Sequence, residues 1–166
     1  MTVPFAALVG LLAALIETTV LPELPIAGAT ADLVLVSAIT ATLVLGIEDG
    51  LIAAFLGGLL IDMLIPARPL GAATFVLLVV LGMAMVVARV AGPSRRWLAV
   101  AMVVVLTPLL HVGIAVVLVL TQGVPLVVDP AVVLVAAFMN GLIALPVAGL
   151  FGAIERRFGA SERVDW

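Results

Sequence analysis

The sequence predicts an all-α, polytopic membrane protein, and three observations lead to this class. Hydrophobic residues make up 66% of the 166 residues and charged residues only 10%, whereas a soluble domain has about 45–50% and about 25%. The mean hydropathy is +1.47. The apolar runs are continuous, unlike the alternating strands of a membrane barrel. A soluble fold of this length cannot bury so much apolar surface, and disordered chains are polar and charged.

Six apolar runs predict a six-transmembrane-helix bundle that forms one integral membrane domain over residues 1–166. About 20 apolar residues cross a bilayer as a helix. The second and third runs are short, and one hairpin dipping into the membrane is the alternative to two spans joined at Glu48-Asp49-Gly50. Prolines or glycines close most of the runs. The predicted spans are 3–21, 33–47, 50–65, 70–91, 97–120 and 130–154.

Polar residues at the boundaries predict helix caps. Asp32 precedes the second run and Asp49 the third, and Ser94 precedes the fifth. Asp129 followed by Pro130 is typical of a helix start, with an acidic cap and proline at the first helical position. Such caps satisfy backbone N–H groups that lipid cannot satisfy.

The arginines predict the orientation of the chain. With six spans, only Arg68 lies on the side opposite the N-terminus. The positive-inside rule therefore places both termini in the cytoplasm. The first run lacks a basic leader and exceeds the usual apolar length of a signal peptide, so we expect it to remain as an anchor. The arginines on the cytoplasmic side are Arg89, Arg95, Arg96, Arg156, Arg157 and Arg163.

Two acidic residues lie inside the predicted membrane boundary. Glu17 and Asp62 each precede the outer end of a span by four residues, a depth of about 6 Å. A charge in lipid is costly and usually paired, and a helix C-terminus disfavours a negative charge. We therefore predict that Asp62 interacts with Arg68, either directly or through the short loop between them. The alternative is that Arg68 extends into the lipid headgroups.

His111 and Asn140 lie near the middle of the fifth and sixth spans. Polar side chains at this depth often form hydrogen bonds between helices, so we predict a contact between these two residues. A proton relay is the less favoured reading, because we expect no other titratable group at their depth. Acidic residues also gather on the outer side, which reflects either exclusion of positive charge or a site for a cation.

Small residues recur four positions apart on three spans. Ala6, Gly10 and Ala14 form one stripe, and residues 144, 148 and 152 form another. The third stripe consists of Gly50, Ala54 and Gly58. Such stripes allow helices to approach closely, either within the bundle or against a partner.

The composition excludes most catalytic chemistry. The chain has no cysteine, no lysine and one histidine, so it lacks a thiol nucleophile, a Schiff-base lysine and a multi-histidine metal site. None of its three serines lies in a G-x-S-x-G motif. We therefore expect no enzyme activity, no cofactor and no bound metal, and no nucleic-acid partner.

Two segments resemble a known family. The run Phe55-Leu56-Gly57-Gly58-Leu59-Leu60-Ile61-Asp62-Met63-Leu64, followed by Leu70-Gly71, resembles the third helix and following loop of the rod shape-determining protein MreD family. Residues 24–28 leading to Asp32 resemble that family's approach to its second helix, although Thr30-Ala31 stand where the family often has Arg-Pro. The length, six spans and short basic tail also agree.

The resemblance implies a non-enzymatic subunit of the bacterial cell-elongation machinery in the cytoplasmic membrane. Such a subunit binds and positions the bitopic protein MreC. Through MreC it acts with a RodA-type glycosyltransferase, a penicillin-binding transpeptidase and, indirectly, the MreB cytoskeleton, supporting peptidoglycan synthesis and cell shape. The family also resembles the substrate-binding subunits of energy-coupling-factor transporters. A vitamin-binding subunit is therefore the alternative, disfavoured because the chain has no tyrosine and its two tryptophans fall on the cytoplasmic side.

Overall fold

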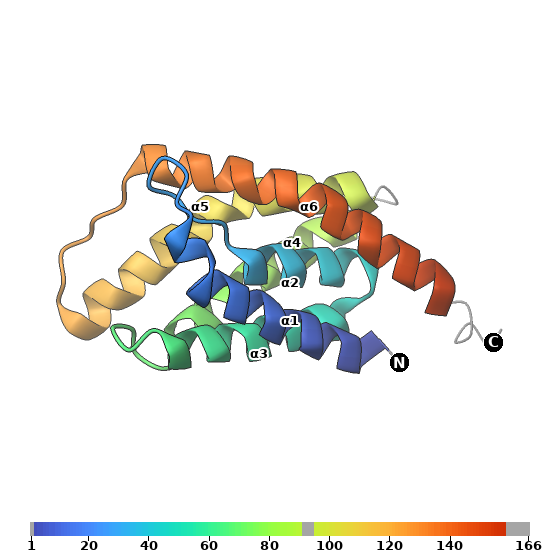
Figure 1. The fold of residues 1–166 in the computed structure, drawn as a ribbon, viewed down its shortest axis with the longest axis horizontal. Coiled ribbons are helices and arrows are strands. Elements are labelled where there is room, and N and C mark those ends of the chain that lie inside the picture. The colour runs from blue at the N-terminus through green and yellow to red at the C-terminus, as the bar shows by residue number, and fades with distance from the viewer. Residues whose placement is uncertain (1, 91–94, 159–166) are drawn as a thin grey trace.

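The computed structural model describes residues 2–90 and 95–158, and this part of the chain folds into six α-helices (Figure 1). A short 3-10 turn, η1 (Leu21–Glu23), follows the first helix. The predicted cap at Ser94 lies outside the described residues, and so does Arg163, which contributed to the predicted orientation. The helices are α1 (Thr2–Thr19), α2 (Leu33–Val44), α3 (Ile47–Leu64), α4 (Ala72–Val90), α5 (Arg95–Gln122) and α6 (Pro130–Phe158).

The turn between α2 and α3 differs from the prediction. Gly46 makes the turn, with φ of +144°, a region that only glycine adopts readily. Glu48 and Asp49 lie in the first turn of α3 instead of in a loop, where negative charge favours the helix dipole. The helix therefore begins three residues earlier than the apolar run suggested.

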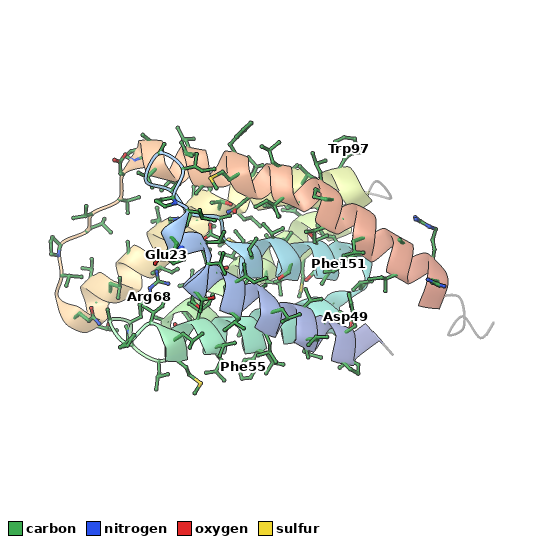
Figure 2. The ribbon with its side chains drawn as sticks, in the orientation of Figure 1. Glu23, Asp49, Phe55, Arg68, Trp97 and Phe151 are labelled. Atoms are coloured by element: carbon green, nitrogen blue, oxygen red, sulfur yellow. The ribbon has the colours of Figure 1, made fainter. Side chains whose placement is uncertain are left out.

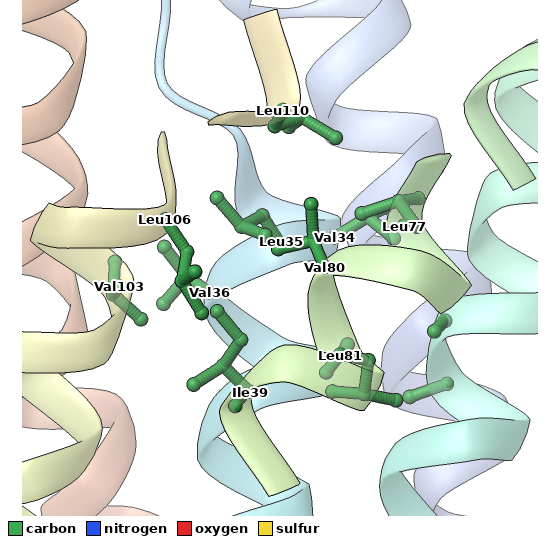
Figure 3. Close-up of a cluster of buried hydrophobic side chains, with 14 of the residues drawn as sticks. Val34, Leu35, Val36, Ile39, Leu77, Val80, Leu81, Val103, Leu106 and Leu110 are labelled. Atoms are coloured by element: carbon green, nitrogen blue, oxygen red, sulfur yellow. The ribbon is translucent and has the colours of Figure 1, made fainter. Parts of the chain in front are cut away.

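The short helix α2 is the centre of the bundle. Eleven of its twelve residues are buried, and each of the other five α-helices contacts it. Its length corresponds to about 18 Å. Figure 3 shows the core that surrounds it, where side chains of α2, α4 and α5 pack together. The labelled residues are Val34, Leu35, Val36, Ile39, Leu77, Val80, Leu81, Val103, Leu106 and Leu110.

The small-residue stripe of α1 packs inside the bundle against α3. A Cβ atom on Gly10 would lie 2.6 Å from the carbonyl oxygen of Ala53, so the two backbones touch at this point. Ala6 and Ala14 are buried along the same line. The α1 stripe thus serves internal packing and is not available to a partner.

The stripe of α3 is internal as well. Gly50 faces Thr42 of α2, and a Cβ atom on Gly58 would lie 2.8 Å from the Cα atom of Thr74 in α4. Ala54 is fully buried. On α6, the alanines at 144 and 148 are also buried. The stripes of α1 and α3 are therefore explained by close packing between helices of this chain.

The outward surface is apolar. Within the described part of the chain, three helical segments are long and apolar enough to cross a membrane: Val3–Glu23, Trp97–Gln122 and Pro130–Arg157. Two shorter apolar helical segments, Leu33–Val44 and Ala72–Val87, accompany them. Figure 2 shows side chains such as Phe55 directed away from the bundle. Helix α1 begins and helix α6 ends at the same end of the bundle (Figure 1).

Candidate functional site: a polar cavity at one end of the bundle

A polar network joins the start of α2 to the middle of α6. The backbone N–H of Asp32 donates to Oδ1 of Asn140 over 2.8 Å. The amide nitrogen of Asn140 donates to Oδ2 of Asp32 over 2.7 Å and to Oγ1 of Thr107 over 3.0 Å. Asn140 is fully buried, and a buried amide group without hydrogen bonds is costly. These three hydrogen bonds satisfy it.

His111 enters the same network from α5. Its Nδ1 lies 3.9 Å from Oδ2 of Asp32 and 3.1 Å from the carbonyl oxygen of Thr107. Among the contacts of the described residues, His111 and Asn140 share Asp32 and Thr107 but form no direct hydrogen bond. The expectation that no titratable group lies at their depth was wrong, because the loop before α2 folds inward and places Asp32 there.

Glu17, and not Asp32, caps the central helix. The Oε2 atom of Glu17 accepts a hydrogen bond from the backbone N–H of Val34 over 2.9 Å. Asp32 occupies the N-cap position of α2 but makes no capping hydrogen bond with its side chain. The predicted cap at Asp32 is therefore corrected: its carboxylate turns to Asn140, and the end of α1 supplies the acceptor instead. The predicted cap at Asp129 is present, since its Oδ1 accepts from the N–H of Ala131 over 2.9 Å.

Asp62 caps α4. Its Oδ1 accepts from the N–H of Ala73 over 2.9 Å. Its Oδ2 accepts from the N–H and the hydroxyl of Thr74 over 3.1 and 2.9 Å. The predicted partner, Arg68, is not among these contacts. The prediction of a direct contact was therefore wrong, and the reason is physical. The carboxylate lies beside the positive end of the α4 dipole and accepts from two amide groups that have no acceptor within their own helix.

Arg68 instead lines a cavity of about 350 Å³ together with Glu17, Asp32 and His111. Thr18 and Thr30 add hydroxyl groups to its wall. Figure 2 shows Arg68 at the same end of the bundle as Glu23 and opposite to Trp97. The rest of the wall is mainly apolar and includes Leu35, Ile61, Ile65, Leu77, Leu110 and Ile114.

The charges around this cavity are only partly compensated. Arg68 lines the same cavity as Glu17 and Asp32. Within the described part of the chain, however, no carboxylate oxygen lies within 4 Å of its guanidinium. Among the same residues, no three metal-ligating side chains are placed so that they could hold a metal ion together. The described residues of the cavity therefore offer both hydrogen-bond donors and hydrogen-bond acceptors. They do not form the ligand set of a metal centre.

The sequence analysis missed one residue of the site and one contact within it. Thr107 lies one helical turn before His111, so both face the same side; that spacing was a usable signal. The pairing of Asp32 with Asn140 joins residues 108 positions apart. No local pattern predicts such a contact.

Comparisons of the chain with protein-family models, with curated proteins and with solved structures found no match.

Proposed function

We propose that this chain is a non-enzymatic membrane subunit of the bacterial rod complex, of the MreD type, which binds and positions an MreC-like bitopic protein. The supporting observation is that the residues carrying the resemblance form one structural unit. Gly57 packs against Val34 of α2 and the backbone of Gly10, and Gly58 packs against Thr74. Asp62 then fixes the start of α4. The motif thus builds a rigid corner between α3 and α4.

In this proposal all six helices lie in the membrane, with both termini in the cytoplasm. The buried helix α2 does not need to match the roughly 30 Å hydrocarbon thickness, because the other helices surround it. The acidic first turn of α3 and Arg156 and Arg157 in the last turn of α6 then lie near the cytoplasmic surface.

The buried stripes cannot receive a partner helix, so the proposal places MreC on an outward surface. Gly149 and Ala153 lie four residues apart on the outer side of α6. Gly149 lies at a shallow groove of about 220 Å³, which it lines with Trp97, Val100, Leu145 and Ala148. A Cβ atom on Gly149 meets nothing within 4 Å. Small outward residues of this kind let a second transmembrane helix approach closely.

The test is affinity purification from native membranes in a mild detergent, followed by mass spectrometry. We expect the wild-type chain to retain an MreC-like protein together with wall-synthesis enzymes. Gly149→Leu should reduce this retention about 10-fold, because it fills the groove. Gly82→Leu is the matched control, since Gly82 also has open space around its Cβ position but lies on α4.

Both variants should keep the circular dichroism spectrum and melting temperature of the wild type. Equal retention by both variants would place the partner elsewhere on the surface. Absence of wall-synthesis proteins from the wild-type sample would contradict the proposed function itself.

The polar cavity favours a second candidate function, a substrate-binding subunit of an energy-coupling-factor transporter. A ligand pocket combines apolar walls with a few convergent polar groups. The cavity joins apolar residues such as Leu35 and Leu110 with the polar groups of Arg68 and Asp32. In the same purification, this function would instead be supported by recovery of paired ATPases and a membrane coupling subunit.

A further inference from the structure

The cavity beside α2 has a guanidinium group with no bound acceptor. The Arg68 side chain carries five N–H donors in a planar fork that matches a carboxylate. Within the described residues, it forms no ion pair. A partly buried guanidinium whose donors the described residues do not satisfy can bind the carboxylate of a ligand.

Two carboxylates, which can bind a cationic group, lie on the wall of the same cavity. Asp32 and Glu17 line the cavity, and each carboxylate can accept about four hydrogen bonds. Asp32 uses Oδ2 for Asn140, with His111 nearby, and Glu17 uses Oε2 for Val34. Both therefore retain acceptor capacity for an ammonium group.

The two carboxylates are held in place by the fold. The two hydrogen bonds between Asp32 and the buried Asn140 fix its side chain and its backbone. The bond from Val34 does the same for Glu17. Binding groups that are already ordered cost less entropy when a ligand arrives.

We propose that this cavity binds a small zwitterion, an amino acid or short peptide, with its carboxylate on Arg68 and its ammonium group between Glu17 and Asp32. The volume of about 350 Å³ lies within the usual range of small-molecule pockets. A simple anion would meet two carboxylates, and a simple cation would meet Arg68. Only a ligand with both charges satisfies all three groups.

The test uses three probes that differ in one charge at a time: glycylglycine, N-acetylglycylglycine and glycylglycinamide. The first is a zwitterion, the second an anion and the third a cation. Each is added at equal ionic strength to the purified full-length chain, and the melting temperature is followed because a ligand of the folded state raises it. We expect glycylglycine to raise the melting temperature and the other two to have little effect.

Variants assign each charge to its site. Arg68→Gln should weaken glycylglycine at least about 10-fold, the loss expected for a charged hydrogen bond, and should favour glycylglycinamide over it. Asp32→Asn and Glu17→Gln should shift the preference towards N-acetylglycylglycine. Glu17→Gln keeps an acceptor for the Val34 amide, so it removes the charge and retains the cap.

The matched controls are Glu23→Gln and Arg156→Gln, which remove exposed charges outside the cavity and should leave glycylglycine binding unchanged. Equal effects of the three probes on the wild type would overturn the proposal, as would undiminished glycylglycine binding by the Arg68 variant. The inference goes beyond the rod-complex role and names the ligand class for the second candidate. Partner retention and probe binding are measured on separate samples, so either proposal can fail alone.

Discussion

Removing the carboxylate of Asp62 should destabilise the start of α4 without affecting Arg68. In Asp62→Ala, the N–H groups of Ala73 and Thr74 and the Thr74 hydroxyl lose their acceptor. Asp62 is buried at 2% exposure, so water does not readily replace it. Each buried donor left unsatisfied costs about 1–3 kcal/mol. Counting the two amide groups, we expect a loss of about 2–6 kcal/mol in the free energy of unfolding.

Asp62→Asn should cost about half as much. Its amide oxygen can still accept from one backbone N–H, but its NH₂ group faces the other donor. The assay is unfolding by an ionic detergent in mixed micelles, followed by helical circular dichroism. Hydrogen exchange adds a local readout, because the amide protons of Ala73 and Thr74 should lose protection first. Glu23→Ala, exposed at the same end of the bundle, is the control and should stay within about 0.5 kcal/mol of wild type.

A double-mutant cycle with Arg68→Ala distinguishes capping from an ion pair. Because Asp62 contacts α4 and not Arg68, the two losses should add to within about 0.5 kcal/mol. A coupling energy well above that, or a stable Asp62→Ala variant with protected amide protons, would refute the capping argument. Exchanging the two charges should likewise fail to restore stability, since an arginine at position 62 would face the positive end of the α4 dipole.

Three other changes follow from the packing and the network, and each is measured as a change in the free energy of unfolding. Gly10→Val should lose about 2–3 kcal/mol by pushing α1 away from Ala53. Gly82→Ala, with open space around it, should be neutral or gain up to about 1 kcal/mol; equal effects at both glycines would contradict the packing argument. Asn140→Ala should lose about 2–4 kcal/mol by leaving Asp32 unpaired; a neutral result would mean that water enters the network. Glu17→Leu should cost about 1–2 kcal/mol more than Glu17→Gln, since only glutamine can cap α2; equal losses would show that the cap is unimportant.

The positions of the helices could largely be predicted from the sequence because each helix forms from an apolar run. The six apolar runs correspond to the six helices of the described residues. The start of α3 was misplaced because the charged residues Glu48 and Asp49 resemble a loop, whereas Gly46 provides the required backbone conformation. A positive φ angle is a property of one residue in its context, and hydropathy contains no information on it.

The stripes of small residues were recognised correctly as contact surfaces, but their direction was not predictable. Gly10, Gly50 and Gly58 each face a neighbouring helix of the same chain. The spacing of the small residues shows which side of a helix they share. It does not show which other helix packs against that side. The neighbour depends on how α2 sits at the centre, which is a property of all six helices together.

The acidic residues show why the site was harder to predict than the fold. Local rules assign the cap of α2 to Asp32, because Asp32 directly precedes that helix. In the structure the end of α1 brings Glu17 to the same amide groups, and one acceptor there is enough. The side chain of Asp32 is therefore not used to cap α2. It accepts a hydrogen bond from Asn140, near Arg68 and His111. Asp32 and Glu17 then line the same cavity. They are 15 positions apart in the sequence, so only the three-dimensional arrangement shows that the two carboxylates meet there.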